Sequence, residues 1–117
     1  MAKSEGRARQ KTKRGVRYDE VRKFAKTLPG VDEGTSYGTP ALKVNKKLLA
    51  RLWEDGETLV LLTTLADRER LLAAAPEALF LTDHYLKYPW ILVRLPMVER
   101  GFLCELIEEA WRLVAEK

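Results

Sequence analysis

Basic and aromatic residues alternate with apolar residues in the segments of this sequence that have the strongest strand character. A period of two places the apolar residues on one face of a strand and their neighbours on the other face. The second face then carries Lys43, Lys47, Arg51, Trp53, Trp90 and Arg94. Cations can contact phosphates and rings can stack on bases, so this pattern predicts a nucleic-acid surface. A solvated sheet face, with long cationic side chains lying across tryptophans, is the alternative interpretation.

The turns between these strands differ in charge. Residues 45–47 are basic, residues 54–57 are acidic, and the loop DHYLKYP places Lys87 between two tyrosines. Because phosphates repel an acidic turn, a DNA surface should use the first and third turns and hold the second away. The predicted DNA contacts are therefore Lys43, Lys46, Lys47, Arg51, Lys87 and Arg94.

The stretch EGTSYGTPALKV, residues 33–44, precedes and includes the first predicted strand. We interpret it as a structural entry to the sheet, in which Pro40 fixes the approach of the chain. The Tyr37 ring should pack down, with its hydroxyl toward the loop at 84–88. A small-ligand site is the alternative, because two polar and aromatic loops can meet in a groove. The residues of that groove would be Tyr37, His84, Tyr85, Tyr88 and Trp90.

Catalytic and metal-binding motifs are scarce. The sequence has one histidine, His84, and one cysteine, Cys104, which are too few for a zinc site. The glycines at 34 and 38 do not have the spacing of a phosphate loop, and no lysine follows them at the required place. His84 is the one side chain suited to acid–base chemistry near neutral pH, and a loop histidine is usually a surface residue. We therefore expect no enzymatic activity, no metal and no cofactor.

Periodicity and turn signals predict the elements that position these residues. Helical spacing of apolar residues marks residues 18–28, 65–75 and 102–114. Thr64 and Asp67 have the spacing of a capping box before the second of these helices. Asp55-Gly56 is the stronger hairpin signal, since both residues tolerate positive φ. Strand-like runs cover residues 41–44, 48–53, 58–63, 79–82 and 90–95. The order α-β-β-β-α-β-β-α predicts one α+β domain, with three helices and a mainly antiparallel sheet of about five strands.

Composition separates a basic tail from the rest of the chain. The 117 residues carry a net charge of +4, but residues 1–17 alone carry +6, which leaves −2 for the others. Residues 1–15 lack large apolar side chains, so we expect a disordered basic tail before a domain at 16–117. No apolar run approaches the roughly 20 residues of a membrane helix. A single cysteine cannot form an internal disulfide, which favours a cytoplasmic location.

Three ordered segments carry a family resemblance: LPGVDEGTSYGTPALKV, LLARLWEDGETLVLL and HYLKYPWILVRL. Together they resemble the MmcQ/YjbR family. The resemblance implies an α+β fold described as a double-wing DNA-binding motif, and it brings no catalytic residues with it. Lys46 departs from the pattern, because a glycine is common at this position in the family. A tight Asn-Gly turn is therefore not expected here, and the first turn becomes more basic.

These observations favour a DNA-binding protein that contacts the phosphate backbone through the first turn, the basic sheet face and the tail. A protein-interaction or small-ligand-binding module, with DNA affinity supplied by the tail alone, is the alternative. No feature of the sequence indicates a protein partner.

Overall fold

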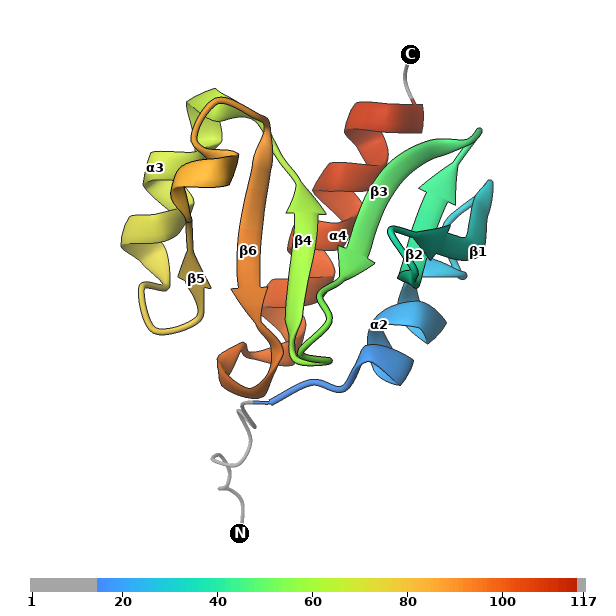
Figure 1. Ribbon diagram of the computed structural model, residues 1–117, viewed down its shortest axis with the longest axis horizontal. Coiled ribbons are helices and arrows are strands. Elements are labelled where there is room, and N and C mark those ends of the chain that lie inside the picture. The colour runs from blue at the N-terminus through green and yellow to red at the C-terminus, as the bar shows by residue number, and fades with distance from the viewer. Residues whose placement is uncertain (1–14, 116–117) are drawn as a thin grey trace, which may run out of the picture.

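An antiparallel sheet in the order β1-β2-β3-β4-β6-β5 forms the centre of the computed structural model, which describes residues 15–115 (Figure 1). The strands are β1 (Val31–Ser36), β2 (Thr39–Val44), β3 (Lys47–Leu52), β4 (Thr58–Leu62), β5 (Leu79–Phe80) and β6 (Trp90–Arg94). The helices are α2 (Tyr18–Ala25), α3 (Leu65–Ala74) and α4 (Arg100–Ala115), with short 3-10 turns at Asp83–Tyr85 and Leu95–Met97. The predicted α+β class is confirmed, and the described residues form six strands rather than five.

The additional strand is β1, which lies in the stretch that we interpreted as an entry to the sheet. All six of its residues pair with β2, from Val31 opposite Val44 to Ser36 opposite Thr39. The connecting residues Tyr37 and Gly38 have φ of 55° and 81°, as a type I′ turn requires. The stretch is thus a hairpin. Its first strand escaped prediction because Val31 is its one buried residue, so it shows no apolar alternation.

The helices cover one face of the sheet and enclose the core with it. Figure 1 shows α4 crossing behind the central strands. Its buried side chains follow the predicted stripe: Leu103, Leu106, Ile107, Ala110 and Val114. Trp111, at the edge of this stripe, donates a hydrogen bond from Nε1 to the carbonyl oxygen of Pro29 at 2.7 Å. This bond joins the last helix to the segment that follows the first one.

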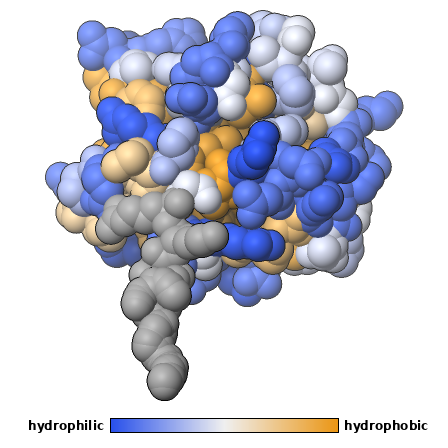
Figure 2. Space-filling model, turned by 90° about the horizontal axis from the view of Figure 1, so that it is seen from below, coloured by the Kyte–Doolittle hydropathy of each residue, from blue (hydrophilic) through white to orange (hydrophobic). Residues whose placement is uncertain are grey.

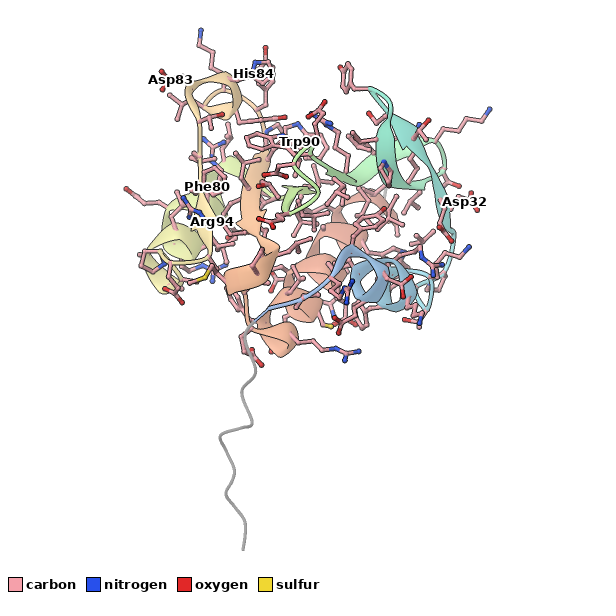
Figure 3. All side chains as sticks on the ribbon, turned by 60° about the horizontal axis from the view of Figure 1, so that its bottom comes forward. Asp32, Phe80, Asp83, His84, Trp90 and Arg94 are labelled. Atoms are coloured by element: carbon pink, nitrogen blue, oxygen red, sulfur yellow. The ribbon has the colours of Figure 1, made fainter. Side chains whose placement is uncertain are left out.

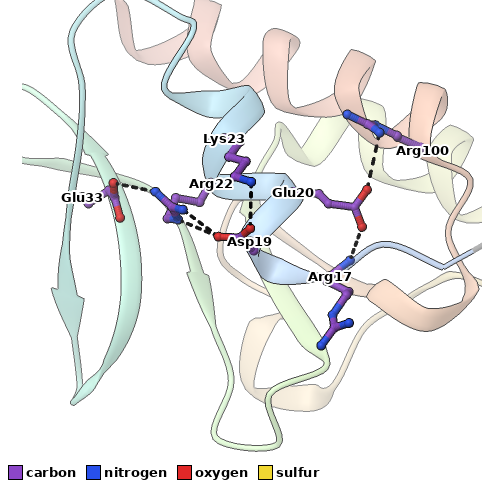
Figure 4. Close-up of polar contacts among 7 residues, drawn as sticks. All are labelled: Arg17, Asp19, Glu20, Arg22, Lys23, Glu33 and Arg100. Atoms are coloured by element: carbon purple, nitrogen blue, oxygen red, sulfur yellow. Dashed lines mark hydrogen bonds and ion pairs between the residues drawn. The ribbon is translucent and has the colours of Figure 1, made fainter.

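Ion pairs on the surface join α2 to its neighbours (Figure 4). Arg22 contacts Asp19 at 2.6 Å on its own helix and Glu33 on β1 at 3.3 Å. Arg100, at the start of α4, lies 3.5 Å from Glu20. The hydrogen bonds from Arg22 and Lys23 lower the pKa of the Asp19 carboxyl. Because these pairs are exposed, they orient the helix more than they stabilise the fold.

Helix α3 begins as its sequence predicts. Thr64 precedes the helix with an extended backbone, and its Oγ1 accepts a hydrogen bond from the Asp67 N–H at 3.1 Å. This bond satisfies one of the N–H groups that every helix leaves free at its start. Leu71 and Ala75 are buried against the core, as expected.

A bulge between β2 and β3 changes which face two predicted residues occupy. Leu42 pairs with Ala50, but Lys43 pairs with Leu48, so Leu49 is the extra residue of β3. Leu49 is fully buried in the core, and Leu48 moves to the face opposite the helices. Lys47 pairs with the core residue Val44 and so lies toward the helix-covered face. Its predicted place beside Arg51 is therefore wrong.

The turn at 45–46 is tighter than the sequence predicts. Asn45 and Lys46 have φ of 51° and 69°, so the two-residue turn forms without glycine. By contrast, residues 54–57 form a longer loop, in which the Asp55 carboxylate accepts hydrogen bonds from the N–H groups of Glu57 and Thr58, both at 2.9 Å. Within this loop, Gly56 is the one residue with positive φ.

The turns lie at opposite ends of the sheet. The strand pairing places residues 45–46 and the loop at 83–89 at one end, and the acidic turn at the other (Figure 1). Figure 2, viewed from the acidic end, shows a mostly hydrophilic surface around a central hydrophobic hollow. The strand ends at the acidic turn are thus separated from the other two turns as predicted, but the side chains of Trp53 and Glu54 reach toward the loop at 83–89.

The described fold begins at residue 15. The N–H of Gly15 donates to the carbonyl oxygen of Val98 at 2.9 Å, and Val16 is buried with its N–H bonded to Leu95 at 2.8 Å. Gly15 has φ of +98°, and a Cβ there would lie 3.2 Å from the Pro96 carbonyl oxygen. The remainder of the predicted tail, residues 1–14, lies outside the described residues. Within the described residues, no helix has the length and apolar character needed to cross a membrane.

Candidate functional site: the open face of the sheet

The sheet face opposite the helices, here called the open face, carries the predicted mixture of cations and rings. The alternation on β6 is confirmed: Ile91 and Val93 belong to the core, while Trp90 and Arg94 are solvent-accessible. Leu92, between them on the strand, faces away from this core but is fully buried. On β2, Lys43 lies on the open face beside Asp32 of the neighbouring strand. The open face therefore combines both charges with aromatic groups.

Five rings form a continuous row across this face, here called the aromatic row. Its members, in order of contact, are Phe80, Trp53, Tyr85, His84 and Tyr88. The centroid distances between successive rings are 6.2, 6.5, 4.8 and 6.3 Å. Two of these contacts are edge-to-face, the arrangement that opposes the positive edge of one ring to the negative face of another. Sequence analysis placed Trp53 on this face and missed Phe80, which belongs to a strand of two residues.

Two arginines stack on aromatic rings. The Arg94 guanidinium lies 4.1 Å from the centroid of Phe80, at one end of the aromatic row. The Arg51 guanidinium lies 5.2 Å from the centroid of Tyr37, and its Nη1 donates to Thr39 Oγ1 at 3.1 Å. Both cations are thereby held on the open face with part of their surface available to solvent.

A groove of about 600 Å³ separates the aromatic row from the β1–β2 hairpin. Figure 3 shows His84 on the loop at 83–89, Asp32 on the β1–β2 hairpin at the opposite side, and Trp90 between them. The lining residues are Tyr37, Leu48, Arg51, Glu54, Val60, His84, Tyr85, Tyr88 and Trp90. The structure thus brings together all five residues of the predicted groove, together with an arginine and a glutamate that the sequence did not assign to it.

Tyr37 does not pack down as we expected. Its side chain is 86% exposed, because the positive φ of the turn directs it away from the sheet. Its ring contact is the Arg51 guanidinium rather than the loop at 84–88. Tyr37 therefore forms a free wall of the groove.

The opposite wall is held by a buried arginine on α3. Arg68 is 9% exposed, and its guanidinium donates to the carbonyl oxygens of Leu86 at 2.6 Å, Tyr88 at 2.7 Å and Tyr85 at 2.8 Å. A longer bond of 3.3 Å reaches the carbonyl oxygen of Trp90. One side chain therefore fixes the backbone of most of the loop at 83–89, here called the aromatic loop. Sequence analysis missed it, because an arginine within a helix looks like a surface residue.

The remaining predicted DNA contacts lie outside the groove. Lys46 is exposed in the turn that ends β2, and Lys87 is exposed in the loop at 83–89. Lys47, as described above, lies toward the helix-covered face. The structure brings Lys43, Arg51 and Arg94 onto one face and distributes the other three lysines around its edge.

The two residues with potential for acid–base or thiol chemistry are placed apart. His84 is exposed within the aromatic row, and Cys104 is half-buried on α4. Burial raises the pKa of the Cys104 thiol, which disfavours the reactive thiolate. Within residues 15–115, no three His, Cys, Asp or Glu residues gather closely enough to hold a metal ion.

Comparison with known proteins identifies the family. A family model described as YjbR matches residues 26–113. The chain belongs to the YjbR family. The crystal structure of Deinococcus radiodurans protein DR2400, described as a DUF419 domain, is similar to this YjbR chain with a TM-score of 0.74. The two sequences are 25% identical over 86% of this chain and 80% of that protein. Among curated proteins, none matches this sequence.

Membership of the YjbR family confirms the resemblance seen in the sequence, and the shared fold with DR2400 confirms the α+β architecture. The match begins at residue 26, after α2, and ends within α4. It therefore contains both walls of the groove, the aromatic row and Arg68.

Proposed function

We propose that this YjbR protein binds DNA on the open face of its sheet. The observation that carries the proposal is the pair of arginine–aromatic stacks, Arg51 with Tyr37 and Arg94 with Phe80, on a face that the described helices leave uncovered. Cations beside exposed rings can contact the phosphates and bases of one strand together. The binding needs no catalytic step.

Charge alone gives this surface only modest attraction for DNA. Asp32 lies opposite Lys43, and Glu54 lines the groove with Arg51. The chain beyond residue 17 carries a formal charge of −2. Contacts of the rings with bases must therefore supply much of the affinity of the folded part, while residues 1–17, with +6, add attraction that does not depend on the fold.

The positions of the turns indicate how a DNA strand would lie on the open face. Lys46 and Lys87 lie at one end of the sheet, and the acidic turn at 54–57 lies at the other. A strand on the open face that reaches the Lys46 end meets Arg51 and these two lysines, whereas Arg94, opposite Thr58, lies at the end next to the acidic turn. The predicted use of the first and third turns is therefore part of the proposal.

Salt-dependent binding of fluorescent DNA tests the proposal. Each phosphate contact that is lost should flatten the plot of log affinity against log salt by about 0.7 for single strands and 0.9 for duplex. Arg51→Ala combined with Arg94→Ala should weaken binding of the full chain and flatten the slope by roughly 1.4 for single strands and 1.8 for duplex. Arg112→Ala, at an exposed ion pair on α4, is the matched control and should change neither quantity.

The contribution of the tail is measured by deleting residues 1–14, which keeps Gly15 and Val16 in the fold. The shortened chain should bind more weakly but still lose affinity when Arg51 and Arg94 are replaced. If deletion abolishes binding at low salt while the chain stays folded, the tail alone binds DNA and the open face does not.

A small-ligand module is the second candidate, and the groove favours it. Its volume of about 600 Å³ falls within the range of roughly 300–1,000 Å³ that is typical of small-molecule sites. A ligand that protects the fold against thermal unfolding without competing with DNA would support this candidate.

A further inference from the structure

We propose that the groove between Tyr37 and the aromatic loop receives one unpaired base, so that the protein prefers single-stranded to duplex DNA. This inference rests on the proposed function, since it names the form of DNA that the open face takes. It depends on the chemistry of the groove walls, on their exposure and on the support beneath them.

The groove walls are suited to the flat face of a base. Tyr37 lies on the hairpin side, Tyr85 and Tyr88 belong to the loop on the other side, and Trp90 lies between the two. Aromatic rings bind bases by stacking on their faces. In a duplex those faces are already stacked on neighbouring bases, and a protein meets the base edges and the backbone instead. A groove walled by rings therefore selects a base that has left the stack or was never paired.

The rings are exposed where a base would enter. Tyr37 is 86% exposed and Tyr88 is 53% exposed, so both present apolar surface to water. Covering that surface with a base is favourable, because apolar area is removed from solvent. Large exposed rings cost a folded protein solubility and add little to its core, which makes a binding role the better explanation of their position.

The aromatic loop is held in place before a ligand arrives. The Arg68 guanidinium donates to the carbonyl oxygens of Tyr85, Leu86 and Tyr88 within 2.8 Å. His84 further contacts Tyr85, at a centroid distance of 4.8 Å, and Tyr88, at 6.3 Å. A wall that is already ordered loses less conformational entropy on binding than a free loop does.

The groove also contains charged hydrogen-bonding groups for the edge of a base. Arg51 can donate from its guanidinium, and the Glu54 carboxylate can accept. Their opposite charges leave the groove close to neutral, which suits a base better than a phosphate. Lys43 and Lys87, outside the groove, are available to the phosphates on either side of the inserted base.

The experiment compares three DNA probes that bind the full chain in the same buffer. They are an oligothymidine of about 12 nucleotides, an abasic strand of equal length and a duplex of equal length. The abasic strand keeps the phosphates and loses the bases, so binding by the tail contributes equally to both single strands. We expect the oligothymidine to bind at least about fivefold more tightly than the abasic strand, which is the low end of one stacked base. It should also bind more tightly than the duplex.

Substitutions in the groove walls test whether those residues cause the tighter binding of oligothymidine. Tyr37→Ala and Tyr88→Ala should each weaken oligothymidine binding by about fivefold or more and leave binding of the abasic strand unchanged. The salt slope should stay the same, because no charge is removed. Tyr37→Phe should retain most of the affinity, since it keeps the ring. Leu86→Ala and Met97→Ala are the matched controls, because both side chains are exposed and apolar but lie outside the groove lining.

The outcomes separate this inference from the function on which it rests. Equal affinity for the base-bearing and abasic strands, or tighter binding of the duplex, overturns the inference and leaves DNA binding standing. Wall variants that bind oligothymidine normally also overturn it. Failure to bind any of the three probes overturns the proposed function itself. Binding of free thymidine monophosphate without binding of any strand rejects the inference in favour of a mononucleotide site.

Discussion

The two faces of the sheet differ in what covers them. The helix-covered face packs against α2, α3 and α4, and its side chains are almost completely buried. The outer surface of the open face consists largely of aromatic rings and arginines, which contact one another and solvent. Packing therefore accounts for the first face, whereas the second keeps stacked groups that add little to the core. Substitutions on the two faces should accordingly affect different properties.

The largest loss of stability should come from the helix-covered face. Leu106→Ala and Trp111→Ala should each lower the free energy of unfolding by roughly 2–5 kcal/mol, because each leaves a cavity against the sheet. Trp111→Ala also removes the hydrogen bond to Pro29. Urea unfolding measures the loss, and the folded fraction should still bind DNA normally. Losses below about 1 kcal/mol for both would contradict the assigned packing of α4.

Arg68 is the point at which the helix-covered side supports the open face. Arg68→Ala should cost roughly 2–4 kcal/mol of unfolding free energy, because several carbonyl groups of the aromatic loop lose the hydrogen bonds from the guanidinium together. Arg70→Ala, at an exposed ion pair on the same helix, should cost less than about 0.5 kcal/mol. Urea unfolding gives both values, and amide exchange should show the loop at 84–90 opening in the Arg68 variant. An unchanged exchange rate in the loop would mean that other contacts hold it.

The turns at the two ends of the sheet differ in backbone strain, because positive φ falls on Asn45 and Lys46 in one and on Gly56 in the other. Lys46 has φ of 69°, a conformation that a side chain with a Cβ resists and glycine adopts freely. Lys46→Gly should therefore stabilise the fold by about 0.5–1 kcal/mol, despite the extra freedom of glycine in the unfolded chain. The same change should weaken DNA binding slightly, since it removes a cation. Thermal unfolding checks the first effect, and a lower melting temperature would show that the turn relaxes without strain.

The acidic turn should make a small contribution that depends on pH. Burial opposes ionisation of Asp55, but hydrogen bonds from Glu57 and Thr58 outweigh it and hold the pKa of this carboxyl below its usual range. A lowered pKa in the folded state adds stability above the pKa of the unfolded chain, about 4, and this stability is lost as pH falls through the folded value. Asp55→Asn should therefore reduce the difference in urea midpoint between pH 5 and pH 3. Glu54→Gln, in the same turn, is the control, and an equal effect of both changes would assign the dependence to net charge.

Several elements could be predicted because their signals are local. The apolar stripe of α4, the Thr64 cap and the alternation on β6 each depend on residues within a few positions of one another. The five aromatic members of the groove could also be named, because the stretch around Tyr37 and the DHYLKYP loop flank the predicted strands.

Tertiary structure decided the features that depend on pairing and on distant contacts. Strand β1 has one buried residue and is held by its backbone bonds to β2, so its own sequence gave little sign of it. The bulge at Leu49 moved Lys47 and Leu48 to faces opposite to those that strict alternation predicts. Arg68 reaches carbonyl groups 17 to 22 residues away. The sequence by itself determined the three helices and five of the six strands, since periodicity and capping act within a few residues. The composition of each face depended on strand register and long-range hydrogen bonds, because these form only when segments far apart in the chain pack together.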